Sequence, residues 1–238
     1  MVLLYRRGAL AGMGYGEANY QDQVKKNDRS CYSLTMSQQG TVTRQRILHE
    51  GLNLLSEAGL AGVTLGNLAA QAKLSKSGLF AHFNSKEDFQ IALLDHMAEV
   101  SAAHVVRPAM RFAAGLPRLK ALVNNWLGWT AKAGLRGGCP VAAALFELDD
   151  ADGPVRDKVL AMESYWRGLL TQLTRQAIEL GHLCVELDVA QFVWELCGIY
   201  LSHHASRRFL RDARSDKRAH TAFAGLLHRS RGTGTELT

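Results

Sequence analysis

The stretch TLGNLAAQAKLSKSGLFAHFNSK, residues Thr64–Lys86, decides the fold of this chain. Thr64 is a favourable helix N-cap, and apolar residues follow it at helical spacing. The spacing then breaks, and Ser75 is placed to cap a second short helix that runs to Phe83. Ser85 is placed to cap a third helix. Two short helices joined by a tight turn, followed by the start of a third, form the layout of a helix-turn-helix.

The second half of this stretch is cationic. Between Lys73 and Lys86 there are three lysines and one histidine, and no acidic residue. Gly78 costs about 1 kcal/mol relative to alanine inside a helix, a cost explained if the backbone closely approaches an outside partner. Lys86 opposes the dipole of the third helix unless an anion binds there. These features are typical of a helix placed in the major groove of DNA.

The motif resembles the DNA-binding domain of the TetR/AcrR family of bacterial transcriptional regulators, over about Thr41–Met97. The residues that carry the resemblance are Thr43-Arg44-Gln45-Arg46-Ile47-Leu48, then Gly59-Leu60 and Thr64, then Ser75-Lys76-Ser77-Gly78-Leu79-Phe80-Ala81-His82-Phe83 with Ser85-Lys86-Glu87. A run of this composition and spacing is rarely produced by chance.

The composition favours an all-α fold. The chain has 238 residues, only four prolines and no alternating β-branched run. The four cysteines show no metal or redox spacing, so we expect a reduced, cytoplasmic setting without metal or cofactor. These are Cys31, Cys139, Cys184 and Cys197. No stretch approaches the roughly 20 apolar residues of a membrane span, and the first residues lack the apolar run of a signal peptide.

The net charge of +6 is not by itself evidence for nucleic-acid binding. Residues 41–100 carry five basic and six acidic side chains, so the predicted DNA-binding domain is not basic overall. Its cations are concentrated in the second half of the motif. The local pattern, and not the overall charge, therefore indicates DNA binding.

The pattern divides the chain into four parts. Residues 1–40 are glycine-rich and polar, and we expect a disordered arm or an over-called start, because MSQQGTVTRQRIL from Met36 resembles where family members begin. A basic arm that reaches the minor groove is the alternative. We predict a helix-turn-helix domain over 41–100, a helical ligand-binding and dimerisation domain over 101–229, and a disordered tail over 230–238.

Helix signals recur through both predicted domains. The first helix should begin at Thr41 or Thr43 and end at Gly59, as a left-handed C-terminal residue. A long helix over 87–106 should join the domains and be stopped or kinked by Pro108. Further helices are predicted over residues 117–129, 141–148, 154–180, 189–210 and, approximately, 216–228.

The resemblance implies that several of these side chains clamp DNA phosphates, with help from N–H groups at helix starts. Thr64, His82 and Lys86 are expected in this role. Arg44 lies in the first turn of its helix, where a solvated face is the alternative to a phosphate contact. For His82 the alternative is a buried, hydrogen-bonded histidine.

The start of the second helix should read the bases. Lys76 and Ser77 are the expected base readers, and Ala81 can touch a thymine methyl group. Phe80 stands where the family more often has tyrosine, so one hydroxyl contact to phosphate is expected to be missing. Because this helix has no Arg, Asn or Gln, we expect DNA shape to contribute strongly to specificity. The full predicted DNA-binding set is Arg44, Thr64, Lys73, Ser75, Lys76, Ser77, Gly78, Phe80, Ala81, His82 and Lys86.

The second domain is expected to hold an effector pocket between helices, mostly apolar with a few polar anchors. The predicted pocket residues, for each of which plain core packing is the alternative, are Trp126, Trp129, Phe146, Met162, Tyr165 and Trp166. By analogy with the family, the last two substantial helices pair with their copies across a two-fold axis.

Three other features of this domain have two interpretations. Cys139 is either a reactive thiol or a buried, inert cysteine. His203 and His204 are adjacent on a helix and should point apart, which argues against a shared metal. The arginine cluster, which we expect to be a solvated face and alternatively to meet an acidic partner or ligand, comprises Arg207, Arg208, Arg211 and Arg214.

These observations predict a ligand-responsive repressor that binds palindromic double-stranded DNA as a homodimer and is released by a small, mostly apolar effector. An enzyme is disfavoured, because the sequence contains no nucleophile–base pair, carboxylate dyad, phosphate loop or metal spacing. The alternative is a helical interaction module of the same fold that no longer binds DNA.

Overall fold

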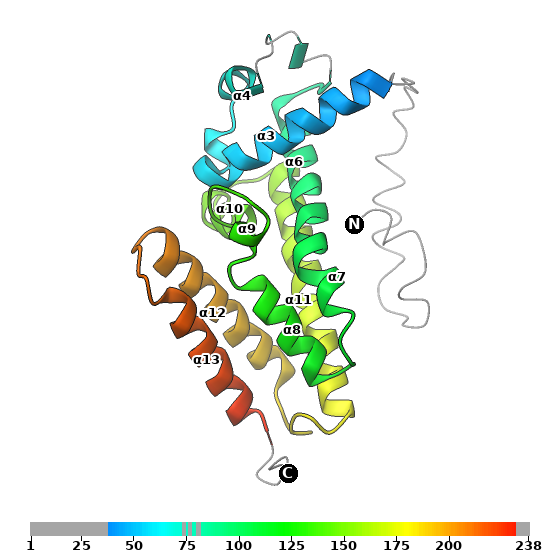
Figure 1. Cartoon of the computed structure of the whole chain (residues 1–238), viewed down its shortest axis with the longest axis vertical. Helices are drawn as coiled ribbons and strands as arrows, with labels where there is room; N and C mark the ends of the chain where they lie inside the picture. The colour runs from blue at the N-terminus through cyan, green and yellow to red at the C-terminus, as the bar shows by residue number, and fades with distance from the viewer. Residues whose placement is uncertain (1–37, 73–74, 76–77, 80–81, 232–238) are drawn as a thin grey trace. The chain divides into compact units, whose positions relative to one another are not determined.

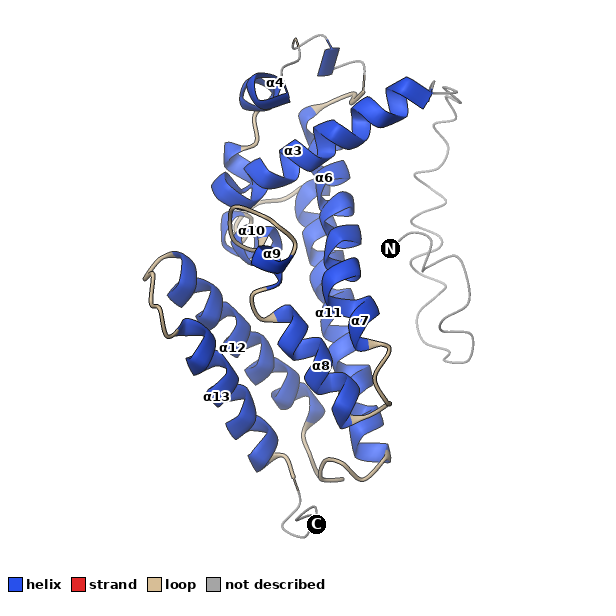
Figure 2. Ribbon diagram, in the orientation of Figure 1, coloured by secondary structure: helices blue, strands red, loops and turns tan. Residues whose placement is uncertain are grey.

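The computed structural model describes residues 38–72, 75, 78–79 and 82–231 (Figure 1). The chain divides into two compact units, residues 1–45 and 46–238. In the first unit, only the opening turns of helix α3 are described. The expectations for an N-terminal arm, for the start at Met36 and for the end of the tail thus lie outside the described residues. All regular secondary structure in the described part is helical, as predicted (Figure 2).

The first two helices begin and end on the predicted signals. Helix α3, Gln38–Gly62, begins slightly earlier than predicted and is broken at Gly59, which has φ 67°. The left-handed conformation predicted for Gly59 is confirmed. Helix α4 spans Leu65–Ala72, and the Thr64 hydroxyl oxygen accepts a hydrogen bond of 3.1 Å from the backbone N–H of Asn67. Thr64 is therefore the N-cap that the sequence predicts.

The remaining two caps of the motif are also confirmed. The Ser75 hydroxyl oxygen accepts from the N–H of Gly78 at 3.1 Å. The Ser85 hydroxyl oxygen accepts from the N–H of Asp88 at 3.0 Å and opens helix α6, Lys86–Ser101. Each bond satisfies a backbone donor that the helix itself cannot pair.

Helix α6 ends at Ser101, before the predicted limit at residue 106, but the helical run continues beyond that limit. A π-helical turn, η1, spans Ala102–Val106, and the short α7, Arg107–Ala109, follows it. Pro108 has no N–H to donate, and the wider turn precedes it. The side-chain amide of Asn125 donates to the Val105 carbonyl at 3.1 Å, so one carbonyl of the irregular turn finds a partner in the next helix.

Six further helices complete the described chain. They are α8 Leu116–Trp126, α9 Trp129–Lys132, α10 Pro140–Glu147, α11 Pro154–Glu179, α12 Val189–Arg208 and α13 Ser215–Arg229. The prediction of a single helix over 117–129 is wrong at its C-terminal end. Gly128 adopts φ 74° and separates α8 from α9. Asp188 caps α12 by accepting from the N–H of Gln191 at 3.0 Å.

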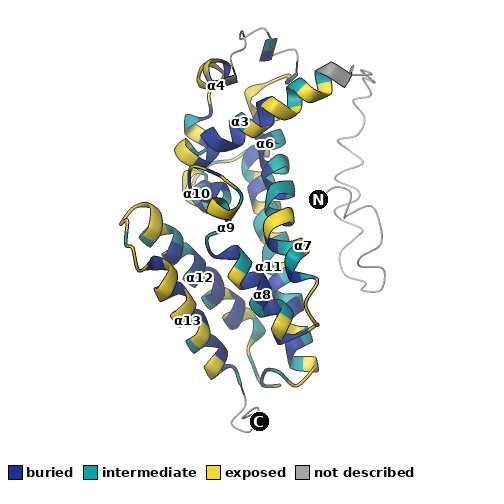
Figure 3. Cartoon of the chain, in the orientation of Figure 1, coloured by how far each residue is buried: buried dark blue, intermediate teal, exposed yellow. Residues whose placement is uncertain are grey.

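One apolar core runs through the second unit. Helices α12 and α13 lie side by side, and α11 packs against α6, α8 and α12 (Figure 1). A continuous cluster of buried apolar side chains extends from Ile47 in α3 to Leu227 in α13 (Figure 3). The helix-turn-helix therefore shares its core with the helices that follow it.

No helix in the described ranges is both long enough and apolar enough to cross a membrane.

Two glycines test how tightly this core is packed. A Cβ added at Gly51 would lie 2.7 Å from Leu93 Cδ2 and 3.0 Å from Phe89 Cζ, both in the buried face of α6. We expect Gly51→Ala to lower the free energy of unfolding by about 1–3 kcal/mol, through overpacking. Gly168→Ala, on the exposed face of α11 where nothing lies within 4 Å, should raise it by about 1 kcal/mol.

Chemical denaturation of both variants measures these changes. Because each replaces glycine by alanine within a helix, their intrinsic helix-propensity gains are similar. A Gly51→Ala protein as stable as Gly168→Ala would show that α3 and α6 do not pack as described.

Candidate functional site

The structure describes six of the eleven predicted DNA-binding residues. These are Arg44, Thr64, Ser75, Gly78, His82 and Lys86. The other five lie outside the described residues, and they are Lys73, Lys76, Ser77, Phe80 and Ala81. The expected base readers belong to the second group.

Thr64 serves as a cap and can still serve as a phosphate ligand. Its exposed hydroxyl accepts from the N–H of Asn67 through an oxygen lone pair. A hydroxyl also carries one proton to donate, which a phosphate oxygen could accept. Capping and phosphate binding are therefore compatible at this position.

His82 is half-buried and follows the short second helix. Its backbone N–H donates to the Leu79 carbonyl at 2.9 Å. Its Nδ1 atom is enclosed and has no hydrogen-bond partner among the described residues. An enclosed nitrogen without a partner is unfavourable, so His82 is not a fully satisfied core histidine.

Lys86 is exposed in the first turn of α6, next to two carboxylates that lie just beyond the cationic stretch Lys73–Lys86. Glu87 and Asp88 share this turn, and Asp88 also accepts from the backbone N–H of Asn84 at 3.1 Å. The negative charges offset the cost of placing a lysine at the positive end of the helix. Lys86 thus does not require a bound anion, although its exposure makes it available to one.

A cavity of about 190 Å³ lies in the second unit, between the segment Gly128–Cys139 and the C-terminal half of α12. Its lining contains three arginines and two histidines, and no carboxylate. The lining residues are Gly128, Trp129, Thr130, Ala131, Leu135, Arg136, Gly137, Gly138, Cys139, Tyr200, His203, His204, Arg207 and Arg208.

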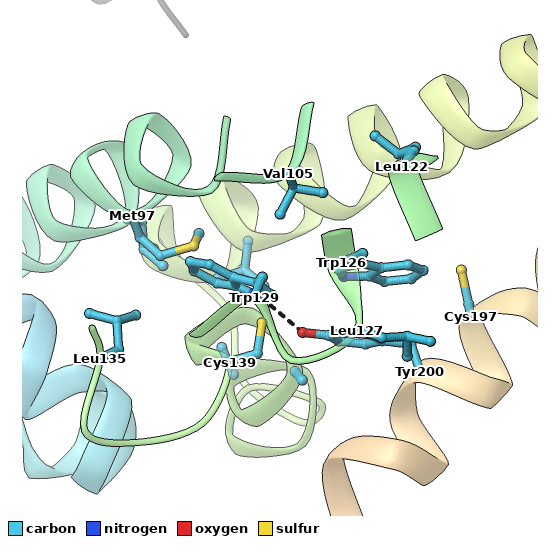
Figure 4. Packing of buried hydrophobic residues seen from close by; sticks show 14 of the residues in the cluster. Met97, Val105, Leu122, Trp126, Leu127, Trp129, Leu135, Cys139, Cys197 and Tyr200 are labelled. Atoms are coloured by element: carbon cyan, nitrogen blue, oxygen red, sulfur yellow. Dashed lines mark hydrogen bonds between the residues drawn. The ribbon is translucent and has the colours of Figure 1, made fainter. Parts of the chain in front are cut away.

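Aromatic side chains form one wall of this cavity (Figure 4). The indole Nε1–H of Trp129 donates to the Tyr200 hydroxyl at 3.0 Å, and the Cys139 thiol lies beside them. Burial raises the pKa of Tyr200 well above 10, so its hydroxyl stays neutral. Trp126 stacks on Tyr200 with ring centroids 4.0 Å apart, and Trp166 packs edge-on against Trp126 at 4.8 Å.

The six predicted pocket residues do not come together around this cavity. Trp129 lines it, whereas Trp126 and Trp166 pack behind Tyr200. Phe146 is 68% exposed on α10. Met162 and Tyr165 are half-buried on α11 and are not among the lining residues. Cys139 is buried, as one of its two interpretations expected, yet it faces the cavity.

Most of the polar residues that line the cavity were not among the pocket residues predicted from the sequence. Two members of the predicted solvated cluster, Arg207 and Arg208, line the cavity, as does Arg136. The signal that could have found this face is the spacing of His204 and Arg208, which lie one helical turn apart. His203 is instead paired with Asp216, at 2.7 Å, and the described residues hold no group of side chains suited to a metal.

The turn that lines the cavity is bonded to helix α3. The N–H of Gly137 donates to the Ser56 hydroxyl at 3.0 Å, and the N–H of Gly138 donates to the Ser56 carbonyl at 2.8 Å. Arg136 pairs with Glu57 at 3.1 Å. A Cβ at Gly137 would lie 1.8 Å from the Ser56 carbonyl oxygen, so only glycine fits there.

A second contact joins α3 to α10. The Glu147 carboxylate accepts from the N–H of Ala61 at 3.0 Å. A Cβ at Gly59 would lie 1.9 Å from the same carboxylate. The cavity turn and α10 together therefore hold the C-terminal half of the helix that leads into the helix-turn-helix.

Comparison with known proteins agrees with this geometry. Residues 47–93 match the family described as bacterial regulatory proteins, tetR family, and residues 115–223 match the tetracyclin repressor-like C-terminal domain. The HTH-type transcriptional repressor NemR of Escherichia coli is 28% identical over 179 residues, which are 70% of this chain and 86% of NemR.

Two solved structures share the fold. A TetR transcriptional regulator from Chloroflexus aurantiacus superposes with a TM-score of 0.72 at 24% identity, over 82% of this chain and 98% of its own. AibR, solved in complex with isovaleryl coenzyme A and operator DNA, superposes with a TM-score of 0.61 at 20% identity. The superposition covers 77% of this chain and 96% of the AibR chain.

The described part of the chain is helical and includes a capped helix-turn-helix, and the family matches make the chain a non-enzymatic DNA-binding transcription regulator. The two family matches place this chain in the TetR family of bacterial transcriptional regulators.

Lys86→Ala tests the phosphate-binding role of the α6 N-terminus. Since Lys86 is exposed, the free energy of unfolding should stay within about 0.5 kcal/mol of wild type. Binding should weaken equally for every DNA sequence, and the slope of log affinity against log salt should fall by about 1. Fluorescence anisotropy across a salt series measures both effects.

Arg111→Ala, which removes an exposed cation after α7, is the matched control and should leave the salt slope unchanged. A Lys86→Ala protein with the wild-type slope would show that this lysine contacts no phosphate.

Proposed function

We propose that this protein is a ligand-responsive transcriptional repressor that acts in the cytoplasm and binds a two-fold symmetric operator as a homodimer. The observation that carries the proposal is the bonded joint between the cavity turn and α3. This joint connects a site able to hold a small molecule with the helix that leads into the DNA-binding motif. NemR, a repressor by name, and AibR, solved with a coenzyme A ester and operator DNA, support the same interpretation.

The division of labour follows the two family matches. The DNA-binding role falls to residues 41–100 and the ligand-binding and dimerisation role to residues 101–229, as the sequence predicted. Within the first, Thr64, His82 and Lys86 contact phosphates. Lys76 and Ser77 read bases, and DNA shape supplies much of the remaining specificity.

Dimerisation is supported by an apolar strip on α12. Trp194 is 65% exposed, and Gly198 and Leu201 follow it at intervals of four and three residues, on the same side of the helix. Gly198 is exposed and Leu201 is half-buried, so Trp194 is the large exposed apolar side chain of this face, and it marks the surface proposed for dimerisation. Because α12 and α13 lie side by side, two copies can form a four-helix bundle around a two-fold axis.

The effector acts by linkage. It binds better to the arrangement that binds DNA less well, so effector and operator weaken each other's binding by the same factor. We place the apolar part of the effector against Trp129 and Leu135, in the cavity. An occupant there displaces the turn that Ser56 holds, and the displacement passes to α3 through the two hydrogen bonds.

The proposal is tested on DNA from upstream of the protein's own gene. We expect protection of two half-sites about one helical turn or slightly more apart, by a dimer. Trp194→Asp places a charge in the proposed interface, so we expect a monomer by analytical ultracentrifugation and at least about a tenfold loss of operator affinity.

Phe112→Asp is the control, because Phe112 is also a large exposed apolar residue but lies outside α12. It should remain dimeric and bind as wild type does. A protein that binds no DNA at low salt, while remaining folded and dimeric, would instead support the interaction module.

A further inference from the structure

The cavity described above carries an excess of positive charge. Arg136, Arg207 and Arg208 line it together with His203 and His204, and no aspartate or glutamate is among the lining residues. A mostly apolar pocket does not require three arginines. All three are exposed residues, so the cavity is open to solvent on its cationic side.

Two of the three arginines form ion pairs with carboxylates that do not themselves line the cavity. Arg207 is bonded to both oxygens of Asp216, at 2.9 and 3.0 Å. Arg136 pairs with Glu57 at 3.1 Å. Arg208 differs, because no carboxylate lies within ion-pairing distance of it among the described residues. It is the one lining arginine in the described part of the chain that has no ion-pair partner.

Arg208 and His204 converge on the glycine turn. A Cβ built on Gly138 would lie 2.6 Å from His204 Cε1 and 3.2 Å from Arg208 Nε. The two side chains thus present a guanidinium and an imidazole next to the turn that is bonded to α3. A guanidinium can donate two parallel hydrogen bonds to a carboxylate.

The neighbours of His204 favour a bound anion. Burial lowers the pKa of His204, and the charges of Arg208 and His203 lower it further. A bound anion would reverse the effect of these neighbouring cations and stabilise the protonated imidazole. His204 would then donate a charge-assisted hydrogen bond alongside Arg208.

The rest of the cavity limits the size and polarity of the occupant. Trp129, Leu135 and Cys139 are buried apolar or weakly polar side chains on the part of the lining formed by residues 128–139. The volume of about 190 Å³ is below the roughly 300–1,000 Å³ of pockets for drug-sized ligands.

We propose that this cavity binds a small organic carboxylate, with the carboxylate group on Arg208 and His204 and a short apolar body against Trp129 and Leu135. The regulatory meaning of this site rests on the proposed function, but binding itself does not. An occupant bound to Arg208 would press directly on Gly138, whose N–H is bonded to Ser56 of α3.

The test is calorimetric titration of the full-length protein, in the absence of DNA, with butyrate and benzoate. Their uncharged amides, butyramide and benzamide, have nearly the same shape and serve as probes without charge. We expect the acids to bind at least about tenfold more tightly than the amides, because only the acids form charged hydrogen bonds. Equal binding of acid and amide, or no binding of either acid, would overturn the proposal.

Arg208→Gln should reduce carboxylate affinity by about tenfold to a hundredfold, with Arg208→Lys in between, since lysine supplies charge without the paired donors. Arg211→Gln is the matched control, because Arg211 belongs to the same cluster but does not line the cavity. Inorganic phosphate is the remaining probe. If phosphate binds as tightly as butyrate, the cavity recognises charge alone and the proposed organic ligand is wrong.

A separate measurement distinguishes this inference from the proposed function. Operator binding is followed by anisotropy with and without the tighter-binding acid. Acid binding without release of DNA would support the site but contradict its regulatory role. Operator binding by a dimer that binds neither acid would leave the regulator proposal standing and overturn the carboxylate site.

Discussion

The structure depends on two hydrogen bonds that backbone N–H groups of a glycine turn donate to Ser56 of helix α3. Ser56 receives the N–H groups of Gly137 and Gly138, one on its hydroxyl and one on its carbonyl. The same turn lines the cavity, and the same helix leads into the DNA-binding motif. The bond from Gly138 joins two backbone groups, so a shift of the turn acts on the backbone of α3 without an intervening side chain. The contact therefore links the cavity turn directly to α3, the helix that leads into the DNA-binding motif and that is distant from the turn in sequence.

A second constraint acts within the motif itself. Three hydroxyl residues, Thr64, Ser75 and Ser85, each end a turn and begin a helix by accepting one backbone N–H. Each cap contributes about 1 kcal/mol and, more importantly, fixes the residue at which its helix begins. The direction in which the first residues of a helix point is set by that starting residue. In the proposed complex, where Lys86 contacts a phosphate, the caps define position as well as stability.

The sequence was sufficient for the features that depend on local spacing. The all-α fold, the three caps, the left-handed Gly59 and most helix limits are read from neighbours only a few residues away. The cavity was not predictable in this way, because it is assembled from a loop and a helix about 65 residues apart. Aromatic residues at helical spacing suggested an apolar pocket, but Trp126 stacks on Tyr200 and Trp166 packs against Trp126 instead. Arg208 was assigned to a solvated face because its loop neighbour could not be known.

The cavity turn meets α3 at Gly137 and α10 meets α3 at Gly59, and both glycines lie in close contact with the segment that faces them. At Gly137 an added carbon would fall on the Ser56 carbonyl, and at Gly59 on the Glu147 carboxylate. A single methyl group at position 137 would wedge the turn away from α3 in every molecule, whether or not a small molecule is present. A substitution at this one position would thus mimic the displacement proposed for a bound effector, while every side chain proposed to contact DNA or effector stays the same.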